Sequence, residues 1–303
     1  MTSDPRHPTL PFPHVSVIGA GLMGAGIAQV CATAGCHVTL RDIDGAQGAK
    51  AKRAIEASTA KLVEKGKLTA EVRDAALAHI AFTDALGAAA QADLVIEAII
   101  EDLAAKQALW REIEELAPPS TVFATNTSSL RVADQAAVTD RPDRFLGLHF
   151  FNPVPLMPLV EVVRTDAADP AIVARAVDFV RRLGKEPVLA HDTHGFIVNA
   201  LLIPYLLDAI RLLERHGGTI ADIDIAMKLG ARYPMGPFTL LDTVGLDTVL
   251  HTTRAMQEEY RESRFQAPPT LERLVAAGRL GRKSGKGFYD WSVEPAVPIE
   301  GGP

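Results

Sequence analysis

The stretch VSVIGAGLMGAGIAQVCATAGCHVTLRD, from Val15 to Asp42, decides the fold of this chain. A short apolar run comes first, and three glycines follow it in the spacing Gly19-x-Gly21-x-x-Gly24. A segment of small and apolar residues and a second β-rich run then lead to Asp42, about twenty residues after the glycines. This order predicts a strand, a glycine turn, a helix and a second strand, which is the dinucleotide-binding fingerprint. The alternative is an ordinary turn between a strand and a helix.

Each glycine has a physical role in holding a pyrophosphate. Gly19 permits the tight turn, Gly21 lets the backbone approach the phosphates, and Gly24 lets the helix pack closely on the strand. The N–H groups at the start of the helix and its positive dipole end then face the phosphates. We therefore expect the cofactor to contact Gly19, Gly21, Leu22, Met23 and Gly24.

The acid that follows the second predicted strand bears on the choice of cofactor. Asp42 would accept hydrogen bonds from the adenosine ribose and would repel a 2′-phosphate, so NAD is favoured over NADP. Arg41 weakens that preference, because an arginine accommodates a 2′-phosphate. Use of the glycine loop for FAD or SAM is a more distant alternative.

The composition excludes several classes of protein. With 303 residues, 48% hydrophobic and 22% charged, the chain is long enough for one large or two unequal domains. Its net charge of -6 argues against nucleic acid as a partner. The longest apolar run, FIVNALLIPYLLDAI, is interrupted by Asn199, Pro204 and Asp208 and is too short to span a membrane. The two cysteines, Cys31 and Cys36, do not resemble a disulfide framework, so we expect a cytoplasmic protein.

The pattern of apolar residues divides the chain into two domains. Between His14 and Lys185, short runs rich in Val, Ile, Leu and Phe alternate with amphipathic helical stretches, which is typical of a Rossmann-type, doubly wound, mostly parallel sheet. After Ala190 the strand signals disappear and the remaining segments predict helices. We therefore expect an α/β fold with a disordered leader at 1–13, an NAD-binding domain at 14–190, an all-α substrate and dimerisation domain at 191–292 and a tail at 293–303.

A titratable pair lies in an otherwise apolar segment, GLHFFNPVPLMPLVEVV, between Gly147 and Val163. If the two ends form a hairpin centred on Pro155, residues whose numbers sum to 310 face each other, and His149 faces Glu161. A lone histidine in such a segment is more often a core residue, but an unpaired buried carboxylate is costly, so the pair favours a general base with an orienting partner. No other His or Cys lies at a metal-ligand spacing, which argues against a metal site.

Seven segments of the chain match the motifs of one enzyme family in order and spacing. They are GAGLMGAGIAQ, DLVIEAIIED, ATNTSSL, GLHFFNPVPLMPLVEVV, GFIVNALLIPYLLDAI, DIDIAMKLGARYPMGPFTLLDTVGLD and LGRKSGKGFYDW. From Val15 to Trp291 the chain resembles the 3-hydroxyacyl-CoA dehydrogenase family, in particular its short bacterial 3-hydroxybutyryl-CoA dehydrogenases. The resemblance implies NAD-dependent interconversion of an L-3-hydroxyacyl-CoA and a 3-ketoacyl-CoA, as in fatty acid and butanoate metabolism, and a homodimer formed through the helical domain.

The resemblance also implies roles for residues at matching positions. His149 would be the catalytic base with Glu161 as its orienting partner, while Ser128 and Asn199 would hydrogen-bond the substrate oxygens. The residues expected along the cofactor are Glu101, Lys106, Ser128, Asn152 and Lys283. Ser58 and Lys65 would meet the CoA moiety, whereas other lysines of the same helix, Lys50 among them, fit a solvated face.

Other interpretations stay open. Ser128 and Asn126 could cap the following helix, and Asn199 could belong to an ordinary kinked helix. The segment HDTHGF departs from the small residues usual in the family, and we assign no catalytic role to His191 or His194. The alternative functions are a dehydrogenase of the same architecture that acts on a free hydroxy or sugar acid, and a non-catalytic dinucleotide-binding protein.

Overall fold

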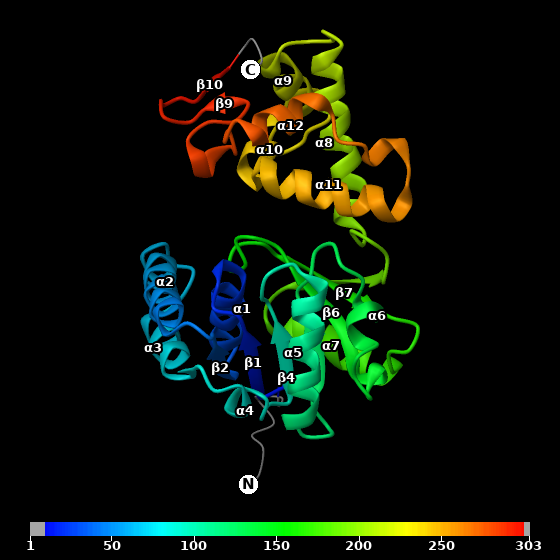
Figure 1. Ribbon diagram of the computed structural model, residues 1–303. Helices are drawn as coiled ribbons and strands as arrows, with labels where there is room; N and C mark the ends of the chain where they lie inside the picture. Colours follow the sequence, from blue (N-terminus) through cyan, green and yellow to red (C-terminus); the bar gives the residue numbers. More distant parts are fainter. Residues whose placement is uncertain (1–9, 300–303) are drawn as a thin grey trace. The chain divides into compact units, whose positions relative to one another are not determined.

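The computed structural model describes residues 10–299, which form two compact units that divide between Thr193 and His194 (Figure 1). The expected boundary lay after Ala190, inside a strand that the structure assigns to the first unit. Within residues 10–299, none of the helices is both long and apolar enough to cross a membrane.

The first unit contains an eight-stranded sheet in the order β3-β2-β1-β4-β5-β6-β7-β8. Strands β1 to β6 are parallel to one another, β7 is antiparallel to β6, and β8 is parallel to β7, so the predicted mostly parallel sheet is confirmed. The strands are β1 (His14–Ile18), β2 (His37–Arg41), β3 (Ile80–Thr83), β4 (Leu94–Glu97), β5 (Val122–Thr125), β6 (Phe145–Phe150), β7 (Leu159–Arg164) and β8 (Glu186–His191).

Two of these strands, β3 and β8, were not expected from the sequence. Both lie at an edge of the sheet. Strand β3 has only four residues, and β8 begins Glu186-Pro187. Edge strands tolerate proline and exposed side chains, so their sequences lack the apolar runs that identify central strands.

Helices flank the sheet and connect its strands (Figure 1). Helices α2 and α3 pack on α1 and on each other beyond the layer formed by α1. The helices of this unit are α1 (Leu22–Thr33), α2 (Gly45–Glu64), α3 (Ala70–Ala78), α4 (Leu86–Ala89), α5 (Leu103–Leu116), α6 (Val132–Ala136) and α7 (Pro170–Arg182), with a short 3-10 helix at Pro142–Arg144.

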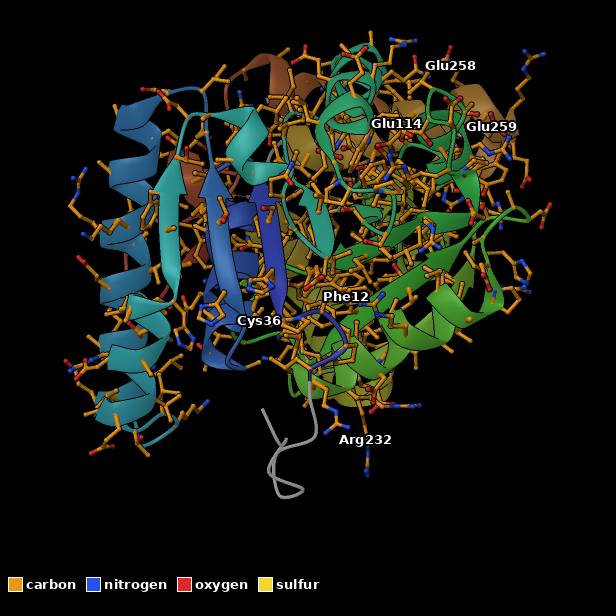
Figure 2. All side chains as sticks on the ribbon, turned by 90° about the horizontal axis from the view of Figure 1, so that it is seen from below. Phe12, Cys36, Glu114, Arg232, Glu258 and Glu259 are labelled. Atoms are coloured by element: carbon orange, nitrogen blue, oxygen red, sulfur yellow. The ribbon has the colours of Figure 1, made fainter. Side chains whose placement is uncertain are left out.

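The segment before β1 differs from the expected disordered leader. Residues 1–9 of that leader lie outside the described residues. Phe12, labelled in Figure 2, is fully buried and packs edge-to-face on Phe179 of α7, with ring centroids 5.3 Å apart. Arg175 lies 4.0 Å above the same ring and donates from Nε to the Pro11 carbonyl oxygen. The prolines around Phe12 suggested a leader, but its aromatic ring supplies part of the core.

The second unit is helical and has its own apolar core. Its helices are α8 (Val198–Glu214), α9 (Ile220–Gly230), α10 (Pro237–Val244), α11 (Leu246–Tyr260) and α12 (Pro269–Ala276), with 3-10 helices at Ser263–Phe265 and Arg282–Ser284. The expectation that this unit is all-α and ends in a loop-like tail needs one correction, because β9 (Tyr289–Asp290) pairs with β10 (Val297–Pro298). Residues 300–303 of the tail lie outside the described residues.

A buried carboxylate explains why so short a pair of strands is ordered. Asp242 of α10 accepts hydrogen bonds from the backbone N–H groups of Phe288 and Tyr289 and from Trp291 Nε1, at 2.8–2.9 Å. Burial raises the pKa of Asp242, although these hydrogen bonds oppose the shift. The chain after α12 is therefore held to the helical core by one side chain.

Replacing Phe12 tests whether the segment before β1 is part of the core. Phe12→Ala should lower the free energy of unfolding of the first unit by about 3–5 kcal/mol, because it removes a fully buried ring. The matched control is Phe82→Ala at an edge-strand position that is 37% exposed, where we expect about 1 kcal/mol or less. Urea unfolding measures both variants, and equal losses would contradict the packing described for Phe12.

Candidate active site

The glycine loop leaves no room for a side chain at two of its three glycines. Gly19 has a φ of 101°, and a Cβ atom there would lie 2.5 Å from the Ala98 carbonyl oxygen. A Cβ atom on Gly24 would lie 1.7 Å from the Gly19 carbonyl oxygen. Such distances exclude any larger residue, so the turn and the close approach of helix and strand both require glycine.

Gly21, unlike Gly19 and Gly24, has open space around the position of a side chain. No described atom lies within 4 Å of a Cβ atom built on it, and its φ of -67° suits any residue. The fold therefore does not require glycine here, whereas a pyrophosphate that approaches the backbone would. A cavity of about 300 Å³ opens beside it, lined in part by Gly21, Leu22, Lys50, Ser58 and Asn152.

Asp42 joins the end of β2 to the glycine loop. Its Oδ2 atom accepts a hydrogen bond of 2.7 Å from the Ala20 N–H, and its Oδ1 atom accepts one of 3.1 Å from the Asp44 N–H. A carboxylate has about four acceptor sites, so both oxygens retain capacity for ribose hydroxyls. Arg41 donates from Nε to the Asp84 carbonyl oxygen at 3.1 Å. The open space at Gly21 and the acid at Asp42 together fit a dinucleotide.

The histidine and the glutamate of the apolar segment lie opposite each other. Strands β6 and β7 pair with Gly147 opposite Val163 and His149 opposite Glu161, which confirms the predicted register. His149 Nδ1 and Glu161 Oε2 are 2.6 Å apart, and the two side chains are 7% and 0% exposed. A hydrogen bond from Nδ1–H to the carboxylate fixes the tautomer of a neutral imidazole and leaves Nε2 as the nitrogen without a proton.

A buried lysine holds the connection between these two strands. Lys185 donates from Nζ to the carbonyl oxygens of Val154 and Met157, both at 2.7 Å. Desolvation lowers the pKa of this ammonium below its ordinary value. The proline-containing connection is therefore fixed at two points, which holds the register that brings His149 to Glu161.

The loop after β5 carries Ser128 and lies beside the end of β6. Asn126 donates from its N–H to the Glu97 carbonyl oxygen at 2.8 Å, and its Oδ1 atom accepts from the Phe150 N–H at 2.9 Å. The second bond attaches this loop to the residue directly after His149. Asn126 is thus a structural link between neighbouring strand ends, which the sequence did not indicate.

The interpretation of Ser128 or Asn126 as a helix cap is wrong. Helix α6 begins at Val132, and its first N–H groups donate to a carboxylate distant in sequence. The Val132 N–H donates to Asp192 Oδ1 and the Ala133 N–H to Asp192 Oδ2, both at 2.7 Å. Asp192 belongs to the segment HDTHGF, so one of its polar residues has a structural role.

Glu101 accepts four hydrogen bonds from the same loop. Its Oε1 atom accepts from Thr127 Oγ1 at 2.6 Å, from the N–H groups of Ser128 and Ser129 at 3.0 and 3.1 Å, and from Ser129 Oγ at 2.9 Å. Burial raises the pKa of the Glu101 carboxyl, but the ammonium of Lys106 and the loop hydrogen bonds lower it more, so it lies below its ordinary value. Glu101 is therefore held as a carboxylate.

Lys106 is almost fully buried and pairs with two carboxylates. Only 1% of its side chain is exposed, and Nζ lies 2.6 Å from Glu97 Oε1 and 3.2 Å from Glu101 Oε2. Its expected position along the cofactor stays a prediction. Glu97 was not predicted as a site residue, although it, like Glu161, is a carboxylate in an otherwise apolar run.

The remaining predicted residues occupy separate places. Lys65 is the C-cap of α2 and does not line the cavity beside Gly21, whereas Lys50 does. Asn199 lies in the first turn of α8, and Lys283 pairs with Asp247 at 2.6 Å, both in the second unit. Their expected roles, with that of Met23 beside the glycines, stay predictions.

A substitution at Gly21 separates the needs of the fold from those of the cofactor. Gly21→Ala should weaken NADH binding by about tenfold or more, because the methyl group occupies the space of the pyrophosphate. Thermal stability should be kept, since that space holds no described atom. Gly48→Ala in α2, where a Cβ atom also meets nothing within 4 Å, is the control and should bind NADH normally. Fluorescence titration measures binding, and unchanged affinity in Gly21→Ala would contradict this site.

Two family models together match nearly the whole chain. Residues 14–193 match the NAD binding domain of 3-hydroxyacyl-CoA dehydrogenase, and residues 195–291 match its C-terminal domain. The mitochondrial hydroxyacyl-coenzyme A dehydrogenase of Homo sapiens is 49% identical over 285 residues, which cover 92% of this chain and 91% of that protein.

Bacterial relatives show the same similarity in sequence and in structure. A 3-hydroxybutyryl-CoA dehydrogenase of Mycobacterium tuberculosis is 46% identical over 279 residues, covering 91% of this chain and 98% of that protein. The crystal structure of (S)-3-hydroxybutyryl-CoA dehydrogenase PaaH1 from Ralstonia eutropha superposes with a TM-score of 0.89 at 37% identity, over 93% of this chain and all of that one. This chain therefore belongs to the 3-hydroxyacyl-CoA dehydrogenase family, with an NAD-binding domain followed by the family's C-terminal domain.

Proposed function

We propose that this chain reversibly oxidises short L-3-hydroxyacyl-CoA thioesters, such as 3-hydroxybutyryl-CoA, to 3-ketoacyl-CoA with NAD. The observation that carries the proposal is the 2.6 Å contact between His149 and Glu161 at the carboxyl edge of a dinucleotide-binding sheet. Ligands of doubly wound folds bind at that edge. The human relative is named hydroxyacyl-coenzyme A dehydrogenase and the Mycobacterium tuberculosis relative 3-hydroxybutyryl-CoA dehydrogenase, and each is matched over most of its length.

In this mechanism His149 moves one proton. When bound, NAD accepts the hydride that leaves C3 of the substrate. His149 Nε2 takes the hydroxyl proton in oxidation, while Nδ1–H keeps its hydrogen bond to Glu161. In reduction the imidazolium returns that proton to the developing alkoxide.

Glu161 acts by keeping the histidine in the productive state. Its carboxylate is fully buried, so its charge is weakly screened where it meets the imidazole. It orients the ring and stabilises the imidazolium. Ser128 and Asn199 would hydrogen-bond the substrate oxygen on which negative charge develops.

The cavity beside Gly21 supports a site for the rest of the substrate and cofactor. Ser58 of α2 and Asn152, which follows β6, line its walls. We assign Ser58, with Lys65 at the end of the same helix, to the CoA moiety, and Asn152 to the nicotinamide end. Lys50 also lines this cavity, and its positive charge suits the phosphates of either molecule.

We also propose a homodimer formed through the second unit. Helices α8 and α9 expose apolar side chains: Leu201 is 70% exposed, Ile225 53% and Leu229 76%. Tyr233, 43% exposed, stacks on Tyr205 with ring centroids 5.2 Å apart. Exposed apolar side chains of this kind are typical of interaction surfaces, and a second copy of this chain is the occupant we infer.

A reducing compartment, the cytoplasm, is the location we propose. Cys31 and Cys36 are both buried, and neither forms a disulfide within the described part of the chain. Such cysteines suit a protein kept in reducing conditions. The mitochondrial location given for the human relative is the alternative.

The proposed reaction is tested by the reduction of acetoacetyl-CoA, followed by loss of NADH absorbance. The rate with acetoacetyl-CoA and NADH should exceed the rate with free acetoacetate and NADH by about tenfold or more. It should exceed the rate with acetoacetyl-CoA and NADPH by a similar factor, since recognition of a substrate group is worth at least that much. A faster reaction with the free acid would favour the hydroxyacid alternative. No reaction with any of these substrates would favour a non-catalytic dinucleotide-binding protein.

The same assay tests the assigned pair. His149→Gln should lower kcat by about 100-fold or more, because a positioned acid–base group contributes a factor of this order. Glu161→Gln should lower kcat less severely, since the histidine remains. Both variants should bind NADH with nearly unchanged affinity, as neither residue lies in the glycine loop. Near-wild-type turnover in either variant would refute its role.

The homodimer is tested by charging its proposed interface. Leu229→Glu should convert the dimer to a monomer in analytical ultracentrifugation, because it buries a carboxylate at an apolar interface. Leu189→Glu, at a 55% exposed position of β8 in the first unit, is the matched control and should remain dimeric. A dimer that persists in Leu229→Glu, or a wild-type monomer, would contradict the proposed surface.

A further inference from the structure

We propose that a cavity near the ends of β7 and β8 binds the phosphate group of a small phosphorylated molecule, held by Arg131, Arg164 and the hydroxyl of Thr165. The cavity has a volume of about 530 Å³, and all of its lining residues belong to the first unit. It shares no lining residue with the cavity beside Gly21. The proposal therefore concerns a second site and does not rest on the reaction proposed above.

Segments far apart in the sequence form the walls of this cavity. They are α6 with the residue before it, Pro142, the segment that follows β7, and the end of β8 with the two residues after it. Much of the lining is alanine, whose short side chain leaves the space open: Ala133, Ala136, Ala137 and Ala167. Cavities of this volume are large enough for a small molecule, so the polar groups in the lining decide which ligand fits.

Two arginines supply the positive charge of the cavity. Within residues 10–299, neither Arg131 nor Arg164 forms an ion pair with a carboxylate. Arg164 donates from Nη2 to His191 Nε2 at 3.1 Å, which uses one of the five N–H groups of its guanidinium. The planar fork of a guanidinium matches the oxygens of a phosphate better than an ammonium does. Both side chains can therefore donate to an anion in the cavity.

The hydroxyl of Thr165 is a second, independent indication of a ligand. Thr165 directly follows β7 and is 6% exposed. Its Oγ1 atom is buried and has no hydrogen-bond partner in the part of the chain that the structure describes. A buried hydroxyl without a partner costs stability. An oxyanion in the cavity would accept from Oγ1 and remove that cost.

The two carboxylates in the lining differ in their effect. Asp192 accepts with Oδ1 and Oδ2 from the N–H groups of Val132 and Ala133, both at 2.7 Å. The first N–H groups of α6 are thus occupied, and the start of this helix is not the binding element. Asp166 is exposed, and its charge opposes an anion, although solvent screens it. The site therefore depends on the two guanidinium groups and the hydroxyl.

The placement of these donors favours a phosphate group over a carboxylate. Arg131 lies directly before α6, whereas Arg164 and Thr165 lie at the end of β7, so the donors come from separate segments. A phosphate group presents three acceptor oxygens in different directions, but a carboxylate presents two in one plane. The cavity volume leaves room for the rest of a phosphorylated molecule.

Titration with inorganic phosphate locates the site. In protein labelled with ²H and ¹⁵N, the amide shifts of residues 164–167 and 191–193 should change in a saturable way. The same changes should occur when NADH and CoA are both present, because the site is separate from the cavity beside Gly21. Sodium chloride at the same ionic strength should not produce them. Changes confined to the glycine loop, or equal changes with chloride, would overturn the proposal.

Thr165→Val separates a binding role of the hydroxyl from a structural one. The variant replaces a buried hydroxyl that has no partner with a methyl group, so the melting temperature without phosphate should be kept or rise. The affinity for phosphate should fall by about fivefold or more, since a hydrogen bond to a charged group is lost. A lower melting temperature with unchanged phosphate affinity would show a structural hydroxyl and would contradict the site.

The charges of the lining are tested by variants with opposite expected signs. Arg131→Gln and Arg164→Gln should each weaken phosphate binding by about tenfold, because each removes a charge-assisted hydrogen bond. Asp166→Asn should strengthen it by about twofold. The control is Arg73→Gln, which removes an arginine of α3 outside the cavity and should leave the affinity unchanged. Wild-type affinity in both cavity arginine variants, or weaker binding in Asp166→Asn, would overturn the proposal.

Discussion

The hydrogen bond between His149 Nδ1 and Glu161 Oε2 is the constraint around which the first unit is arranged. A fully buried carboxylate is tolerated only when it is paired, and this pairing requires β7 to run antiparallel to β6 in one register. A shift of the pairing register by one residue would place the two side chains on opposite faces of the sheet. Lys185, which holds the connection between the strands, therefore supports the pair from a distance.

The other polar groups of the candidate site lie at the carboxyl edge of the sheet. Strands β1, β4, β5 and β6 are parallel, so their last residues meet at one edge. The glycine loop follows β1, Glu97 ends β4, and His149 lies near the end of β6. Each of these strands is largely buried and apolar, yet each ends near a polar residue or leads into the glycine turn. Polar groups here are held by one another, and that preorganisation keeps donors and charges fixed while a substrate reacts.

The sequence predicted those features whose signal lies within a short segment. The glycine spacing, the acid at Asp42 and the symmetric register of His149 with Glu161 are local patterns, and the structure agrees with them. Features that join distant segments were missed. Asp192 caps α6 from sixty residues away, and Asn126 accepts a hydrogen bond from the Phe150 N–H, which lies 24 residues further along the chain. The edge strands β3 and β8 and the buried Phe12 were missed because their local sequences resemble loops.

The most direct test of this account is the protonation of the His149 imidazole, read from ¹⁵N shifts in protein labelled at histidine and assigned with His149→Gln. In the neutral ring, the account predicts that Nδ1 carries the proton, donated to Glu161, and that Nε2 is the unprotonated nitrogen that exchanges a proton with substrate. Glu161→Gln should abolish that preference. A wild-type neutral ring protonated at Nε2 would contradict the account, because its base would then face Glu161.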